Sequence, residues 1–314
     1  MPNKAEYLRI SLINECNFSC FYCRPPQLKK QSEVVQTKPE KFKTAISFLH
    51  GLGIRKIRFT GGEPTLYRGL TDLISYAKSL DASLHTAVTT NGRLLSHLAP
   101  DLGKAGLDSI NISLDTLDAA RFHQITASDS LNHVLKGIEK AIVTVPKVKL
   151  NCVVVKGVND DEIGSMVEFA NRMGVDIRFI EYMPTRNSHG QTRGYLAGAE
   201  ILSRISYPLS PLNSNPHSAA RYYISGRLSI RVGLIAPVSR PFCLECNRIR
   251  LTANGNLYGC LFSGECINLF EMLERAPDDV SSQLERLISL RTNTGCSYLP
   301  KGDKYLPSFM VTGG

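Results

Sequence analysis

The chain has 314 residues, of which 43% are hydrophobic and 21% are charged, and its formal net charge is +9. This length and composition predict a globular protein with a large core, built as one large α/β domain and a smaller second domain. The sequence contains no run of 18 apolar residues, and residues 1–13 mix charges with a strand pattern where a signal peptide would have an apolar core. We therefore expect a cytoplasmic protein without a membrane segment.

Short apolar strands alternate with amphipathic helices from residue 7 to about residue 183, which is typical of repeated βα units. The first expected helix, for example, lies between Pro39 and Gly51 and has one apolar face. The expected strands are 7–13, 55–59, 83–88, 109–113, 148–155 and 176–182. Six βα units are too few to close an eight-stranded barrel. The predicted fold is therefore α/β, a partial (βα)6 TIM-like barrel with its site at the carboxyl ends of the strands.

The alternation ends at residues 184–200, which contain Pro, Gly, Asn and Thr and are expected to form a linker. Residues 222–235 contain two apolar stretches around a Ser-Gly turn, which predicts a pair of antiparallel strands. We therefore assign residues 1–200 to the partial barrel and residues 201–314 to a smaller C-terminal α+β domain.

Three cysteines follow the first expected strand in a C-x3-C-x2-C pattern, namely Cys16, Cys20 and Cys23. Thiolates this close together on one loop can reach the same metal centre. An iron–sulfur cube usually takes four thiolates, so three cysteines leave one iron open, as in a catalytic metal site. The alternative is a set of structural or zinc-binding thiols. Zinc sites usually contain a second paired knuckle, however, and none lies nearby in the sequence.

A second group of three cysteines, Cys243, Cys246 and Cys260, has the pattern C-x2-C-x13-C. Between them, Asn254-Gly255 is a strong hairpin signal, so we expect Cys260 to fold back beside the other two. Zinc and iron–sulfur are both compatible with this spacing. Cys266, or one of the seven His residues, could supply a fourth ligand.

Positive side chains alternate with apolar ones along several expected strands. Lys56 and Arg58 lie two residues apart and so share one face, whereas Ile57 and Phe59 share the other. Because helices cover the outside of such a barrel, the cations should point into its lumen. The same argument applies to Arg9, Lys149 and Arg178 in the barrel, and the same alternation occurs at Arg248 and Arg250 in the C-terminal hairpin.

These seven cations repel one another and lose hydration unless an anion lies between them. Arg and Lys bind phosphates, so a polyphosphate substrate is the simplest interpretation. Any single one of them could instead be a solvated side chain. A nucleic acid is disfavoured, because its backbone needs an outer basic stripe with aromatic residues, which the sequence does not show.

The first cysteine motif, with Tyr22 before its third cysteine, resembles that of the radical S-adenosylmethionine (SAM) superfamily. Within it, most of the chain resembles the GTP 3′,8-cyclases of molybdenum cofactor biosynthesis, the MoaA family. Besides the two cysteine groups, the matching segments are Leu8-Arg9-Ile10-Ser11, Lys56-Ile57-Arg58, Thr60-Gly61-Gly62-Glu63-Pro64, Thr89-Thr90-Asn91-Gly92, Ser113-Leu114-Asp115, Lys149, Arg178-Phe179-Ile180-Glu181, Met183, Asn247-Arg248-Ile249-Arg250-Leu251, Cys260-Leu261-Phe262 and Gly313-Gly314. This combination is far more specific than any one motif.

The resemblance implies cofactors and site residues. It implies two [4Fe–4S] clusters, held by Cys16, Cys20 and Cys23 and by Cys243, Cys246 and Cys260. It implies SAM binding by Tyr22, Gly62, Glu63, Ser113 and Met183. It implies GTP binding by Arg9, Lys56, Arg58, Thr89, Lys149, Arg178, Arg248 and Arg250, of which Arg248 and Arg250 would also be catalytic.

The resemblance also implies a reaction, that of a lyase. SAM is cleaved to a 5′-deoxyadenosyl radical, which takes the ribose 3′ hydrogen of GTP, and the carbon radical attacks C8 of guanine. The product is (8S)-3′,8-cyclo-7,8-dihydroguanosine 5′-triphosphate, the first intermediate of molybdenum cofactor (molybdopterin) biosynthesis. Implied partners are a reductant such as flavodoxin or ferredoxin and a cyclic pyranopterin monophosphate synthase that takes the product, with no nucleic acid and no membrane. A homodimer is compatible with the resemblance.

The sequence departs from the family at a few positions. Arg24 stands where Met is usual, and the C-terminal segment 307–312 is unlike the usual one. Cys266 matters most, because as a ligand of the second cluster it would leave no open iron for guanine. The alternative interpretation is therefore a radical SAM paralogue, a peptide maturase with an auxiliary cluster and a different substrate. A zinc-containing protein that binds nucleotides or RNA is the non-enzymatic alternative.

Overall fold

The computed structural model describes residues 5–23, 36–183, 194–213, 217–261 and 264–290. Most of the expected linker lies outside these residues, as do Arg24, residues 307–312 and the terminal Gly313-Gly314. In the described part of the chain, no helix is both long and apolar enough to cross a bilayer.

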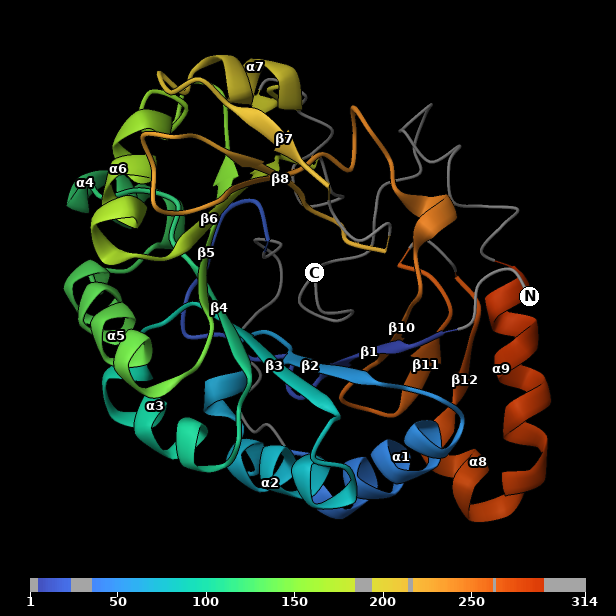
Figure 1. Cartoon of the computed structure of the whole chain (residues 1–314). Helices are drawn as coiled ribbons and strands as arrows, with labels where there is room; N and C mark the ends of the chain where they lie inside the picture. The colour runs from blue at the N-terminus through green and yellow to red at the C-terminus, as the bar shows by residue number, and fades with distance from the viewer. Residues whose placement is uncertain (1–4, 24–35, 184–193, 214–216, 262–263, 291–314) are drawn as a thin grey trace.

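Among the described residues, twelve strands form one sheet in the order β12-β11-β10-β1-β2-β3-β4-β5-β6-β9-β8-β7. The strands are β1 (Tyr7–Ser11), β2 (Lys56–Thr60), β3 (His85–Thr90), β4 (Ser109–Ser113), β5 (Val148–Val154), β6 (Asp176–Glu181), β7 (Ser210–Leu212), β8 (Arg221–Ile224), β9 (Val232–Ile235), β10 (Arg248–Leu251), β11 (Asn256–Tyr258) and β12 (Cys266–Asn268). The helices are α1 (Pro39–Gly51), α2 (Leu70–Leu80), α3 (Leu95–Lys104), α4 (Ala119–Thr126), α5 (Leu131–Thr144), α6 (Ile163–Met173), α7 (Gly198–Ser203), α8 (Leu269–Arg275) and α9 (Val280–Ser289), with 3-10 turns η1 (Pro64–Leu66), η4 (Cys243–Glu245) and η5 (Pro277–Asp279). The sheet curls, with the helices on its outer side (Figure 1), and residues of its inner face line a cavity that we call the lumen.

Strands β1 to β6 pair in parallel and in sequence order, as repeated βα units require. Two C-terminal strands extend this row, because β10 pairs in parallel with β1 and β9 pairs in parallel with β6. The hairpins β8–β9 and β10–β11 are antiparallel, and Gly255 has the positive φ of 88° that the second turn needs. The predicted partial barrel is confirmed, and its parallel part is two strands wider than six βα units provide.

The hydrophobic core lies between the outer face of the sheet and the surrounding helices. Ile57 and Phe59 of β2, Phe179 of β6 and Phe42 of α1 are fully buried and belong to this core. Because side chains alternate along a strand, the residue between Ile57 and Phe59, which is Arg58, faces the lumen.

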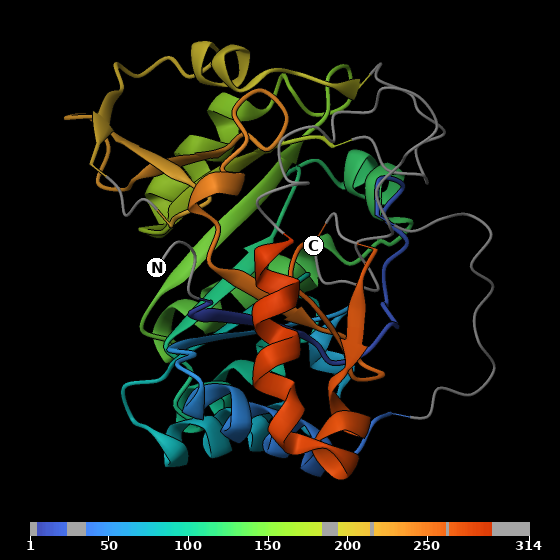
Figure 2. The same ribbon diagram turned by 90° about the vertical axis from the view of Figure 1, so that its right-hand side faces the viewer.

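Helix α8 packs against helix α1. The ring of Phe270 in α8 meets that of Phe42 in α1 edge to face, with the ring centroids 5.4 Å apart. Helices α8 and α9 stand beside the β10–β12 edge of the sheet (Figure 2). The C-terminal strands are thereby held against the N-terminal half, and residues from both ends of the chain share the lumen.

Candidate active site

The lumen of the sheet is a cavity of about 990 Å3. Every residue that the sequence analysis assigned to a metal, to SAM or to GTP lines it. These residues are Arg9, Cys16, Cys20, Tyr22, Cys23, Lys56, Arg58, Gly62, Glu63, Thr89, Ser113, Lys149, Arg178, Met183, Cys243, Cys246, Arg248, Arg250 and Cys260. The chain therefore gathers all of the expected site residues in one place.

The two cysteine groups approach the cavity from different elements. The first lies on the loop after β1, whereas Cys243 begins the short turn η4, Cys246 follows that turn, and Cys260 follows β11. The β10–β11 hairpin brings Cys260 back toward the pair, as the Asn-Gly signal predicts. Burial raises the pKa of Cys23 to about 12, with Cys16 nearby adding to the rise. Within the described ranges, no group of three His, Cys, Asp or Glu side chains is arranged to hold a metal ion.

Cys266 lies apart from these groups. It begins β12, the edge strand of the sheet, is exposed, and stands opposite Tyr258 in the register. The described residues that line the cavity include Cys243, Cys246 and Cys260 but not Cys266.

Strand register sets the cations into rows across the lumen. Arg250 of β10, Arg9 of β1 and Arg58 of β2 lie directly opposite one another. Residues opposite one another in neighbouring strands point to the same face, so the three guanidinium groups share the lumen side. One step toward the amino ends of the strands, Tyr7 lies between Arg248 and Lys56 in the same way.

Protein groups fix some of these cations. Arg58 donates from Nε to the hydroxyl of Tyr7 at 2.5 Å, and from Nη1 to the Val88 carbonyl at 3.1 Å and to Thr89 Oγ1 at 3.0 Å. Lys149 donates to the hydroxyl of Tyr222 at 2.8 Å. These bonds hold each cation in place, and Arg58 and Lys149 form no ion pair with a carboxylate in the described part of the chain.

Arg178 is less well satisfied. Its Nε and Nη2 atoms are shielded from solvent and have no hydrogen-bond partner among the described residues. A buried donor without a partner is unfavourable, so an acceptor at this position would stabilise the site.

Burial and mutual repulsion depress the pKa values of the cations. Burial together with the positive charge of Arg58 lowers the pKa of Lys56 to about 8, although Tyr7 opposes the shift. Burial together with Arg178 lowers the pKa of Lys149 to about 7, and burial together with Arg248 lowers that of Arg250 to about 10. An anion bound between these cations would favour their charged forms and would therefore raise their pKa values again.

The loop that leads to the first cysteines is fastened to the turn after β2. Gly62 N donates to the carbonyl of Ile13 at 2.7 Å, and Glu63 N donates to that of Glu15 at 2.6 Å. A Cβ atom on Gly62 would lie 2.0 Å from the Glu15 carbonyl oxygen. Only glycine permits this approach, so the Gly-Gly-Glu-Pro turn positions the residue just before Cys16.

The side chain of Glu63, in the same turn, is buried and accepts hydrogen bonds from two segments of the chain. Its Oε1 accepts hydrogen bonds from Thr65 N, Thr65 Oγ1 and Thr90 Oγ1 at 3.1, 2.6 and 2.6 Å, and its Oε2 accepts one from Asn91 N at 2.7 Å. Burial raises the pKa of Glu63, and these four bonds oppose the rise. Both carboxylate oxygens are thus engaged with the protein, so Glu63 shapes the cavity wall by joining the ends of β2 and β3.

Two lining residues carry no role in the sequence analysis. Asp115 accepts a hydrogen bond from the hydroxyl of Tyr22, and Tyr7 accepts one from Arg58. Asp115 ends a matching motif, and Tyr7 stands two residues before Arg9 on the same strand face. The alternation of side chains along β1 could therefore have predicted that Tyr7 faces the lumen. The contact of Asp115 could not be predicted in this way, because its partner Tyr22 lies on a loop 93 residues away in the sequence.

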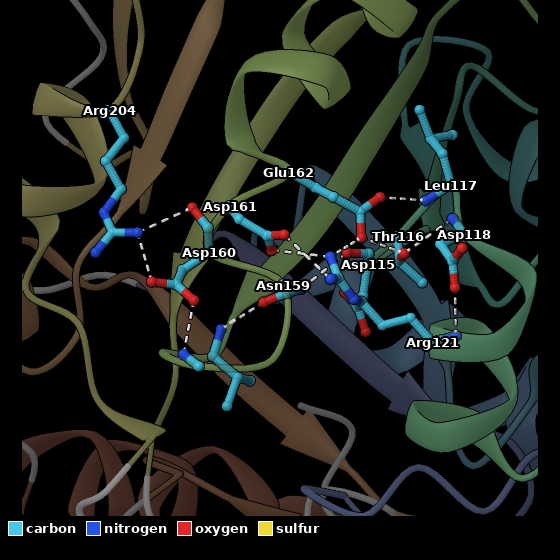
Figure 3. Close-up of polar contacts among 12 residues, drawn as sticks. Asp115, Thr116, Leu117, Asp118, Arg121, Asn159, Asp160, Asp161, Glu162 and Arg204 are labelled. Carbon is cyan, nitrogen blue, oxygen red and sulfur yellow. Dashed lines mark hydrogen bonds and ion pairs between the residues drawn. The ribbon is translucent and has the colours of Figure 1, made fainter.

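Asp115 also takes part in polar contacts between the loops after β4 and β5, where its backbone carbonyl accepts a hydrogen bond from Asn159 Nδ2 at 2.8 Å (Figure 3). Glu162 accepts hydrogen bonds from Thr116 Oγ1 at 2.5 Å and from Leu117 N at 2.9 Å. Arg121 pairs with Glu162 and makes a two-point contact with Asp161. The loop after β4 is thereby fixed to the loop after β5, and Asp115 at the start of the first loop lines the cavity.

Comparison with known proteins gives a family match over nearly the whole chain. Residues 10–170 match the family described as the radical SAM superfamily, and residues 175–295 match that described as Molybdenum Cofactor Synthesis C. The GTP 3′,8-cyclase of Clostridium botulinum (strain Hall) is 38% identical over 270 residues, which cover 85% of this chain and 84% of that protein. The GTP 3′,8-cyclase of Pseudomonas putida (strain W619) is 38% identical over 292 residues, 91% of this chain and 87% of that protein.

More distant matches agree with these. Molybdenum cofactor biosynthesis protein 1 of Drosophila melanogaster is 37% identical over 290 residues, which cover 90% of this chain and 50% of that protein. Among solved structures, Streptococcus suis SuiB bound to S-adenosylmethionine superimposes with a TM-score of 0.66 at 15% identity, covering 88% of this chain and 65% of that one. At this level of identity the likeness concerns the fold alone.

Proposed function

This chain belongs to the radical SAM superfamily and, within it, to the GTP 3′,8-cyclases, and we propose that it cyclises GTP to (8S)-3′,8-cyclo-7,8-dihydroguanosine 5′-triphosphate. In this role it is a lyase that carries out the first step of molybdenum cofactor biosynthesis. The observation that carries the proposal is the single cavity that joins two groups of three cysteines to a cationic face.

We propose that the cysteines hold two [4Fe–4S] clusters on the ground of their donor chemistry, although no three described His, Cys, Asp or Glu side chains already surround a single metal-ion position. Cys16, Cys20 and Cys23 would hold one cluster, and Cys243, Cys246 and Cys260 the other, with three thiolates each, which are the soft ligands that such clusters take. When bound, the first cluster and SAM supply the radical chemistry that removes a hydrogen atom from the nucleotide. The residues assigned to SAM are Tyr22, Gly62, Glu63, Ser113 and Met183.

Within this set, the geometry suggests different tasks. The backbone of Gly62 and Glu63 and the side chain of Tyr22 hold the cysteine loop at one end of the lumen. Ser113, at the end of β4, and Met183, beyond β6, line the wall between that loop and the cations. SAM would thus lie against the carboxyl ends of the strands, where barrel enzymes carry their sites.

The cations would hold the triphosphate of GTP. Arg9, Lys56, Arg58, Lys149 and Arg178 project from the barrel strands, with Thr89 beside Arg58. Arg248 and Arg250, on β10, lie between these cations and the second cysteine group, so we assign them to orienting the nucleotide for ring closure. Fixing both reacting carbons inside the lumen would lower the entropic part of the barrier.

The remaining assignments complete the proposal. Residues 1–200 form the barrel unit and residues 201–314 the auxiliary-cluster unit, whose strands β9 and β10 extend the two edges of the barrel. We further propose a cytoplasmic enzyme that takes electrons from a flavodoxin or ferredoxin and passes its product to a cyclic pyranopterin monophosphate synthase. A homodimer is compatible with these assignments.

A peptide maturase is the second interpretation. The SuiB fold match also includes a structure described as bound to the precursor peptide SuiA, with a TM-score of 0.66 at 16% identity. A peptide substrate does not account for seven cations on the lumen face, whereas a triphosphate does. We therefore prefer GTP.

The test is anaerobic turnover of the reconstituted protein with SAM, GTP and a reductant. The reconstituted protein should contain about eight irons per chain. The reaction should yield 5′-deoxyadenosine together with a cyclised nucleotide. Arg250→Glu should abolish GTP turnover while slow SAM cleavage persists, and Arg172→Glu on the outer helix α6 should change neither. SAM cleavage that GTP does not affect would favour the maturase, and zinc without iron would end the proposal.

A further inference from the structure

Tyr7 stands in the middle of the cationic face. It begins β1 and lies opposite Lys56 of β2 on one side and Arg248 of β10 on the other. The ammonium nitrogen of Lys56 is 5.1 Å from the centre of the Tyr7 ring, and the guanidinium carbon of Arg248 is 5.8 Å from it. The hydroxyl oxygen accepts a hydrogen bond of 2.5 Å from Nε of Arg58.

The charged groups around Tyr7 come from every strand packed against it. They are Arg9 on β1, Lys56 and Arg58 on β2, and Arg248 with Arg250 on β10, and Arg178 of β6 also interacts with Tyr7 electrostatically. One strand further, His85 of β3 lies opposite Lys56, and burial lowers its pKa to about 4, so it is neutral at neutral pH. Lys56 and Arg58 form no ion pair with a carboxylate of the described ranges.

The acidity of Tyr7 reflects this setting. Burial alone would raise the pKa of a tyrosine, but Arg58, Arg9, Lys56 and Arg248 together lower the pKa of Tyr7 to about 7. The phenolate and the cations stabilise each other, since a short hydrogen bond to a charged partner is among the strong ones. A dissociable proton therefore sits within the set of groups assigned to the triphosphate.

We propose that Tyr7 is the internal counter-ion of the cationic face and that an incoming polyphosphate displaces its negative charge, so that nucleotide binding takes up a proton at this tyrosine. The inference rests on the proposed GTP function and concerns the same site. It assigns to Tyr7 a positioning role: in the empty site it holds Arg58 and screens the repulsion that would spread the cations apart.

The direction of the pH effect follows from competition between two anions. Triphosphate charge near Arg58 and Lys56 disfavours the phenolate, so the pKa of Tyr7 rises when the nucleotide binds. The same anion favours the charged forms of Lys56 and Lys149, whose pKa values of about 8 and about 7 also rise. All three groups take up protons on binding, and nucleotide affinity must therefore fall as the pH increases above about 7.

The experiment is calorimetric titration of the anaerobically reconstituted protein with GTP and, separately, with inorganic tripolyphosphate. Buffers of different ionisation enthalpy report the protons taken up. Tyr7→Phe should take up about one proton fewer near pH 8. It should also bind more tightly than the wild type at high pH, the affinity ratio rising by about tenfold between about pH 7 and about pH 8.5.

A structural tyrosine would behave differently, because its loss would weaken binding equally at every pH. Tyr67→Phe is the matched control, since it removes a buried hydroxyl that donates to the Thr37 carbonyl outside the lumen, and it should leave affinity unchanged. As a check that needs no variant, tripolyphosphate added to wild type near pH 8 should reduce the ultraviolet difference band of phenolate.

The outcomes separate this inference from the function beneath it. An affinity ratio that stays flat with pH, with no loss of phenolate absorbance, overturns the role of Tyr7 while leaving GTP as the ligand. If neither GTP nor tripolyphosphate binds, the proposed function fails and this inference fails with it. Tripolyphosphate binding with a proton uptake that Tyr7→Phe reduces supports the counter-ion even if GTP is not cyclised.

Discussion

The hydroxyl of Tyr22 donates a 2.5 Å hydrogen bond to Oδ2 of Asp115, across 93 residues of sequence. Tyr22 belongs to the cysteine loop, and Asp115 follows the end of β4. The other oxygen of Asp115 accepts a bond from Val153 N at 2.8 Å, which ties the same carboxylate to β5. The loop that carries the first three cysteines is therefore fastened to the rigid sheet at a second point besides Gly62.

The burial of Asp115 makes the stability of the protein depend on pH, and the hydrogen bonds from Tyr22 and Val153 only partly oppose this effect. Burial raises the pKa of Asp115 to about 6 from the usual 3.8. The unfolded chain releases this proton first, so the stabilisation present below the unfolded pKa is lost as the pH rises through about 6. Between about pH 4.5 and about pH 7 the loss should be about 2 kcal/mol. The side chain of the Asp115→Asn variant cannot ionise. The free energy of unfolding of this variant, relative to that of the wild type, should therefore increase by this amount between the two pH values.

Denaturant unfolding of both proteins at the two pH values measures this difference. A constant gap between Asp115→Asn and the wild type would mean that the buried carboxylate does not titrate in this range. The gap at a single pH also contains the altered hydrogen bonds to Tyr22 and Val153, so only its change with pH tests the prediction.

Gly62→Ala should disturb the first cluster without unfolding the barrel. The new Cβ would meet the Glu15 carbonyl at 2.0 Å, and this backbone atom cannot yield unless the chain beside Cys16 moves. We expect iron content to fall from about eight to about four per chain. Gly164→Ala is the control, because a Cβ there, in α6, meets nothing within 4 Å. It should raise stability by about 0.5–1 kcal/mol.

Iron analysis and circular dichroism of the two glycine variants separate local from global effects. Full iron content with normal SAM cleavage in Gly62→Ala would contradict the idea that this turn positions the cysteine loop.

The lumen-facing cations of the barrel could be predicted from the sequence because side-chain alternation is local. Once residues 56–60 are recognised as a barrel strand, the burial of Ile57 and Phe59 directs Lys56 and Arg58 to the other face. The turn at Asn254-Gly255 could be predicted for the same reason. The hairpin turn needs a positive φ, and the Asn-Gly dipeptide by itself indicates residues that adopt it.

Pairings between distant strands could not be predicted in this way. No local pattern indicates that β10 lies beside β1 in parallel, and this pairing sets Arg250 opposite Arg9. The same register surrounds Tyr7 with cations. The lowered pKa of Tyr7 therefore depends on β1, β2 and β10 together and could not be predicted from any one of these strands. Cys266 illustrates the limit, because its sequence distance from Cys260 suggested a ligand and the β11–β12 pairing sets it at the sheet edge.

Arg178→Met should stabilise the protein and weaken nucleotide binding. Two of its guanidinium nitrogens are buried without a partner in the described chain. A buried donor without a partner costs about 1–3 kcal/mol, so an apolar side chain at this position should add stability of that order. Loss of a phosphate contact should at the same time lower GTP affinity by about tenfold or more. Thermal unfolding and GTP titration measure the two effects, with Arg172→Met on the exposed side of α6 as control. A less stable variant with normal GTP affinity would mean that Arg178 has a structural role.

Cys266→Ser decides whether the second cysteine group keeps an open coordination position. Cys266 is exposed on β12 and lies opposite Tyr258, whereas Cys260 lines the cavity. We therefore expect Cys266→Ser to retain about eight irons and GTP turnover, and Cys260→Ser to fall to about four irons while SAM cleavage continues. Iron analysis and the SAM-plus-GTP assay on both variants measure these outcomes. If Cys266→Ser instead loses the second cluster, that cluster has four protein ligands, guanine cannot reach an open iron, and a substrate other than GTP becomes the better assignment.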